Sequence, residues 1–78
     1  MVYTGSSRKN ICGIKVRELR QTKGLTLEAL AAQLQLRGAD IGSGTLSQIE
    51  NGSRYVTDKE LVAFVKVLGV RVDVLLSL

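Results

Sequence analysis

The stretch "GSGTLSQIENGS", residues 42–53, decides how the rest of the chain is interpreted. Residues three and four apart lie on the same face of a helix, so a helix here has two distinct faces. One face contains Leu46 and Ile49 together with the carboxylate of Glu50. The opposite face has only small or amide side chains: Gly44, Ser47, Gln48 and Asn51. The pattern raises two questions, namely what the uncharged polar face contacts and what neutralises the inward-facing Glu50.

Two helices are predicted before this stretch. The apolar spacing indicates one helix from a cap at Asn10 to Gly24, and another from a cap at Thr26 to Gly38. The quoted stretch itself predicts a third helix over about 43–50, which ends at the Asn-Gly pair that follows.

Two further helices are predicted after it. Thr57 and Glu60 have the spacing of a capping box, and Gly69 ends the apolar pattern that follows them. The alternating residues of "VRVDVLLSL" also fit a strand, but no other segment is predicted as a strand that could pair with it. A short fifth helix over 73–77 is therefore preferred. The predicted fold class is all-α, a compact bundle of five short helices.

Composition limits the class of protein. A chain of 78 residues with 45% hydrophobic content suits one domain with a modest core, and we predict a flexible arm over 1–9 and a domain over 10–78. There is no histidine, and the single cysteine, Cys12, is predicted to be a core residue. Metal sites and nucleophile–base catalysis lack their usual residues, so we expect no enzyme activity, no metal and no cofactor.

The charge distribution favours a polyanionic partner. The net charge is +4, and the first 24 residues carry six of the eleven basic side chains but one of the seven acidic ones. A solvated helix face is the alternative explanation for this excess. No signal peptide or membrane-spanning run is found, so we expect a cytoplasmic, nucleoid-associated protein.

Three segments together resemble the Cro/phage-repressor type (XRE family) of helix-turn-helix domain. They are "IKVRELRQTKGLTLEALAAQL" at 14–34, "GTLSQIENGSR" at 44–54 and "LVAFVKVLGV" at 61–70. The order of the segments is specific, whereas each alone is weak. The resemblance covers roughly 11–77 and implies a lambda-repressor-like fold that binds double-stranded DNA.

In that family the third helix lies in the DNA major groove. The positions that correspond to base-reading residues are Ser43, Gly44, Thr45, Ser47 and Gln48. The Gln48 amide is both donor and acceptor and can match the N6/N7 edge of adenine. Serine discriminates poorly and glycine offers no side chain, so DNA shape is expected to contribute to specificity. The alternative is that these are ordinary surface residues.

The resemblance also implies phosphate contacts and a structural ion pair. The phosphate candidates are Lys23, Thr26, Asn51, Arg54, Arg8, Lys9 and Arg37. Arg54 is the strongest of them at this stage. A buried carboxylate needs a partner, and the pairing usual in the family implies an Arg20–Glu50 bridge from the first helix to the third.

The chain departs from the family in two places. Leu27 stands where the family often has a glutamine that helps to hold phosphate, so that contact is expected to be missing. The segment 37–44 is longer than the usual turn between the second and third helices. It is expected either to lengthen the second helix or to bring Arg37 to the DNA backbone, while Ile41 fills the core.

The preferred function is a sequence-specific transcriptional regulator, and specifically a repressor. Such domains usually dimerise, and the apolar segment 70–78 is expected to contribute to a homodimer interface or else to fold onto the first and fourth helices. The alternative function is a protein-interaction module, such as an antitoxin or adaptor. A basic rim around the third helix is the feature that favours DNA over that alternative.

Overall fold

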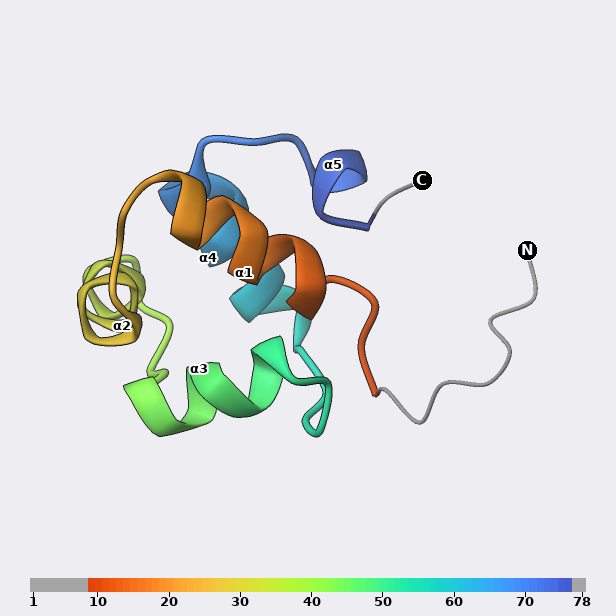
Figure 1. Ribbon diagram of the computed structural model, residues 1–78, viewed down its shortest axis with the longest axis horizontal. Helices are drawn as coiled ribbons and strands as arrows, with labels where there is room; N and C mark the ends of the chain where they lie inside the picture. The colour runs from red at the N-terminus through yellow and green to blue at the C-terminus, as the bar shows by residue number, and fades with distance from the viewer. Residues whose placement is uncertain (1–8, 77–78) are drawn as a thin grey trace.

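The computed structural model describes residues 9–76 and consists of five helices joined by turns (Figure 1). The helices are α1 (Gly13–Thr22), α2 (Leu27–Leu36), α3 (Ser43–Glu50), α4 (Asp58–Leu68) and α5 (Val72–Leu76). No strand occurs in this part of the chain. The predicted all-α fold and the order of its helices are therefore confirmed. The fifth helix begins one residue earlier than predicted, and residue 77 lies outside the described range.

The helices pack around one apolar core. Helix α1 contacts α3, α4 and α5, while α2 contacts α3 and α4 (Figure 1). Large side chains that are fully buried in this core come from every helix and from the turn before α3: Val16, Leu30, Leu34, Ile41, Leu46, Ile49, Phe64, Leu68 and Leu75. Cys12 is buried in the same cluster. The core leaves the opposite side of α3 facing outward, because only the Leu46 and Ile49 side of that helix points into it.

Side-chain caps define two of the helix starts, as the sequence predicts. The Thr26 hydroxyl accepts a hydrogen bond of 3.0 Å from the amide of Ala29 at the start of α2. Thr57 and Glu60 form the reciprocal capping box of α4. Helix α1 differs from the expectation, since its first helical residue is Gly13 and not the residue after Asn10.

The turn between α2 and α3 is longer than a short helix-turn-helix connection but is well anchored. Gly38 adopts a left-handed φ of 86°, and Ala39 donates a 3.0 Å hydrogen bond to the carbonyl of Leu34. This closes α2 in a Schellman motif, so the turn does not lengthen the helix. Ile41 is fully buried, and its carbonyl accepts a 3.2 Å bond from the Gln35 side chain. These contacts fix where α3 begins.

Candidate nucleic-acid interface

Helix α3 has one buried face and one exposed polar face. Leu46, Ile49 and Glu50 are buried. The exposed residues are those of the predicted polar face: Gly44, Ser47, Gln48 and Asn51. Of the other predicted base-reading residues, Ser43 and Thr45 are half-buried. The structure thus places the predicted base-reading residues along one helix, with Ser47 and Gln48 as its most accessible side chains.

Glu50 is paired with Arg20, at the end of α1. Arg20 Nε lies 2.8 Å from Glu50 Oε2, and Arg20 Nη2 lies 3.1 Å from Oε1. The remaining arm of the guanidinium, Nη1, donates a 2.9 Å bond to the carbonyl of Leu25. One side chain therefore joins α1, the turn before α2 and the last residue of α3. A fork-shaped pair of this kind fixes geometry as well as charge.

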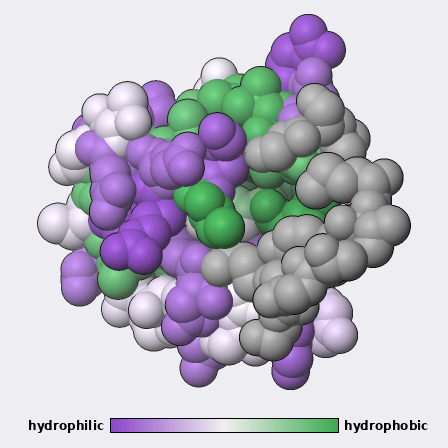
Figure 2. Space-filling model, turned by 45° about the vertical axis from the view of Figure 1, so that its right-hand side comes forward, coloured by the Kyte–Doolittle hydropathy of each residue, from purple (hydrophilic) through white to green (hydrophobic). Residues whose placement is uncertain are grey.

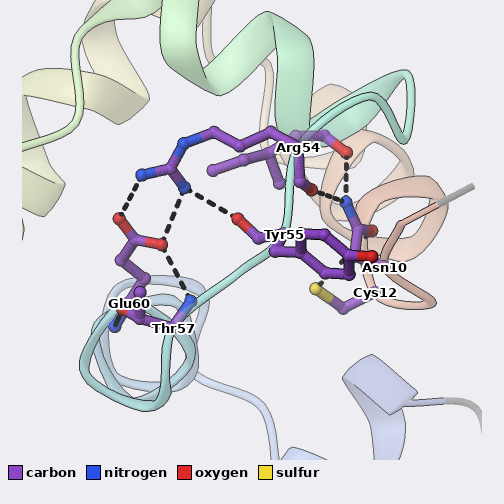
Figure 3. Close-up of polar contacts among 7 residues, drawn as sticks. Asn10, Cys12, Arg54, Tyr55, Thr57 and Glu60 are labelled. Carbon is purple, nitrogen blue, oxygen red and sulfur yellow. Dashed lines mark hydrogen bonds and ion pairs between the residues drawn. The ribbon is translucent and has the colours of Figure 1, made fainter.

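Asn10 forms a second connection that the sequence analysis did not find. Its Nδ2 donates to the carbonyls of Ile49, at 3.0 Å, and Arg54, at 2.8 Å (Figure 3). Its Oδ1 accepts a 2.7 Å bond from the amide of Gly13. The sequence indicated only the cap of α1. The contacts with the end of α3 arise from residues about forty positions away and leave no local signal.

Arg54 is paired within the protein, although its side chain remains 33% exposed. Its Nη1 and Nη2 lie 2.8 Å and 3.0 Å from the two carboxylate oxygens of Glu60, and Nη1 also donates to the Tyr55 carbonyl at 2.9 Å (Figure 3). The hydrogen bond from Arg54 lowers the pKa of Glu60 below its ordinary value of 4.5, and the amide of Thr57 lowers it further. The charge of Arg54 is partly offset by Glu60, and its role as the strongest phosphate contact stays a prediction.

Three of the other phosphate candidates lie exposed near the ends of α2 and α3. Lys23 and Thr26 precede the first turn of α2, where backbone N–H groups favour an anion. Glu28 is also exposed in that turn and opposes such binding electrostatically. Asn51 follows α3, and its Oδ1 accepts a 3.0 Å bond from the Ser53 amide. Each of the three therefore remains accessible to a ligand.

The remaining candidates lie elsewhere. Arg37 is exposed and lines a shallow groove with Asp58, Lys59 and Val62, which belong to the first turns of α4. Arg8 lies outside the described residues. Lys9 is exposed, and its amide donates a 2.8 Å bond to the carbonyl of Gly52, just beyond α3.

Two helices joined by an anchored turn, with the second presenting a polar face, define a small helix-turn-helix domain. The helix-turn-helix domain family matches residues 12–78 of the chain, and the chain therefore belongs to this family. Such domains are typically non-enzymatic and bind DNA. Among curated proteins and among solved structures, no match was found. Within residues 9–76, no helix is long and apolar enough to cross a membrane, and no group of three metal-ligating side chains is found.

Proposed function

We propose that this protein is a sequence-specific transcriptional regulator of the Cro/phage-repressor (XRE) type, acting as a repressor. The observation that carries the proposal is the exposed polar face of α3, whose buried face is fixed by the Arg20–Glu50 pair. Helix α3 enters the major groove as a rigid unit, because the ion pair and the core set its direction. Membership of the helix-turn-helix family supports the DNA-binding part of this proposal.

Base reading is assigned to the exposed side chains of α3. The Gln48 amide donates one hydrogen bond to an adenine and accepts another from it, while the Ser47 hydroxyl forms a less selective hydrogen bond. Ser43 and Thr45 are half-buried and contact the groove from the start of the helix. A Cβ atom at Gly44 would meet no atom within 4 Å, so this glycine leaves an open surface where DNA approaches closely.

Phosphate binding is assigned to the residues that flank α2 and α3. These are Lys23, Thr26, Asn51 and Lys9, with Arg8 outside the described residues. Arg54 and Arg37 contribute less, since Glu60 offsets the first and the second faces α4. Binding by such contacts is steeply dependent on salt, because each neutralised phosphate releases counterions.

A homodimer is proposed to read two half-sites about 34 Å apart. Within the C-terminal segment, Leu75 is buried in the core, whereas Val72 and Val74 are 46% and 40% exposed. Figure 2 turns this side of the molecule toward the viewer and shows hydrophobic side chains on it among hydrophilic ones. We therefore propose both roles for the segment: Leu75 completes the core, and Val72 and Val74 contact a second copy.

The alternative function is a protein-interaction module such as an antitoxin or adaptor. It is supported by the internal pairing of Arg54 and the position of Arg37, which leave a thinner basic rim around α3 than the sequence suggests. Such a module would bind DNA only through its general positive charge.

Fluorescence anisotropy distinguishes the two functions. Short duplexes that tile the DNA upstream of the protein's own gene are titrated at low and near-physiological salt. A repressor binds one duplex tightly in both conditions, and Gln48→Ala reduces the preference for that duplex while Gln33→Ala, on the exposed side of α2, does not. Weak and uniform binding that is lost at higher salt instead favours the interaction module.

A further inference from the structure

Lys9 and Tyr55 lie together beyond the C-terminal end of α3. The Lys9 Nζ stands 5.7 Å from the centroid of the Tyr55 ring, within range of a cation–π contact. Both side chains face solvent, and Tyr55 is 69% exposed despite its size.

The main chain of both residues is held in place. The amide of Lys9 donates to Gly52, and the neighbouring Asn10 is buried with its bonds to Ile49 and Arg54. The carbonyl of Tyr55 accepts from the Arg54 guanidinium, which Glu60 fixes in turn. The pair is therefore anchored to the loop that follows α3, where Figure 3 shows Tyr55 next to Arg54. The position of the Lys9–Tyr55 pair relative to α3 is therefore fixed.

The chemistry of the pair fits a phosphodiester. Among the residues that the structure describes, no carboxylate pairs with Lys9 and no group bonds the Tyr55 hydroxyl. The charge of the neighbouring Arg54, by contrast, is offset by Glu60. The ring restricts the lysine side chain, which lowers the entropy lost on binding. A lysine ammonium and a tyrosine hydroxyl are both donors of the kind that bind phosphate oxygens.

We propose that Lys9 and Tyr55 form a phosphate-binding site that fixes the C-terminal end of α3 on the DNA backbone. The proposal rests on the proposed DNA-binding function and assigns Tyr55 a role in it. In this site Lys9 neutralises the phosphate and the Tyr55 hydroxyl donates to it. The contact carries no sequence information of its own, and it fixes the register of α3 on the duplex.

The test compares Lys9→Gln with Lys66→Gln, which removes the same charge from an exposed position on α4. Binding of the preferred duplex and of an unrelated duplex is measured by anisotropy over a range of salt concentrations. Lys9→Gln is expected to weaken both duplexes roughly fivefold to tenfold and to reduce the slope of log K against log salt by about 0.9. Lys66→Gln is expected to leave the slope unchanged.

Tyr55→Phe keeps the ring and removes the hydroxyl, and it is expected to weaken both duplexes by roughly twofold to tenfold. If the unmodified protein binds DNA and Lys9→Gln behaves like Lys66→Gln, the phosphate site is overturned while the proposed function stands. If the unmodified protein binds no duplex, the proposed function fails and the site fails with it.

Discussion

Arg20 and Glu50 form a two-bond ion pair, at 2.8 and 3.1 Å, between residues thirty positions apart. Their side chains are 13% and 6% exposed, so solvent screens the pair only weakly. A carboxylate at the last residue of a helix meets the negative end of the helix dipole, and the positive charge of Arg20 opposes this unfavourable effect. The pair thus sets the position of α3 against α1.

Removing the Glu50 charge is expected to destabilise the fold. Glu50→Gln removes the main counter-charge of the partly buried Arg20, and the expected loss is about 3 kcal/mol of unfolding free energy. Urea unfolding followed by circular dichroism measures it. The control is Glu18→Gln, which breaks an i,i+3 pair whose side chains are 33% and 57% exposed and should change stability by less than about 0.5 kcal/mol. Equal stability of Glu50→Gln and the unmodified protein would contradict a structural role for the pair.

The protonation of Glu60 makes the stability of the fold depend on pH in the acid range. Its folded-state pKa is lowered from 4.5, chiefly by the hydrogen bond from Arg54. The unfolded chain therefore takes up the proton first as the pH falls. The stabilisation is fully present above the unfolded pKa and is lost as the pH falls through the folded pKa. Urea midpoints measured from pH 6 downward should fall less steeply for Glu60→Gln than for the unmodified protein, and parallel curves would argue against this assignment.

Two glycine substitutions are expected to have opposite effects on stability. Gly38→Ala places a Cβ on a residue with a φ of 86° and should cost about 1 kcal/mol. Gly44→Ala lies in the first turn of α3 with open space around it and should stabilise by roughly 0.5 kcal/mol. The proposed function adds that Gly44→Ala weakens DNA binding despite its higher melting temperature. Unchanged affinity would mean that Gly44 does not face the DNA.

Arg54 is expected to act on stability more than on DNA affinity. Arg54→Gln breaks the partly exposed pair with Glu60 and should cost about 1 kcal/mol. The salt dependence of DNA binding should stay close to that of the unmodified protein, because Glu60 already offsets the charge. A slope reduced by about 0.9 for Arg54→Gln would restore the original assignment of Arg54 to phosphate.

Most of the fold could be predicted because its signals are local. The caps at Thr26 and Thr57 and the ends of the helices near Gly38 and Gly69 depend on residues within one turn of each other. The assignment of "VRVDVLLSL" required one more argument, the lack of a partner strand, and α5 at Val72–Leu76 agrees with it. These elements could be predicted because the backbone geometry at a helix end is set by the residues closest to it in the sequence.

The candidate site could be predicted only in part. The two faces of α3 follow from helical spacing, and the structure shows them. The ion-pair partners of the basic residues could not be predicted, because the sequence does not indicate which carboxylate an arginine contacts in the folded chain. Arg54 pairs with Glu60 and Arg37 lies beside α4, so two of the predicted phosphate contacts have other surroundings.

The sequence by itself determined the helices, their caps and the composition of the polar face of α3, since these depend on the periodicity and conformational preference of short segments. Tertiary structure decided which charges are offset and which remain available. Packing brought Asn10 to the end of α3, Glu60 to Arg54 and Lys9 to Tyr55. Whether a charged side chain can bind a ligand depends on how close it lies to other charges. Residues that are far apart in the sequence come close only when the chain folds.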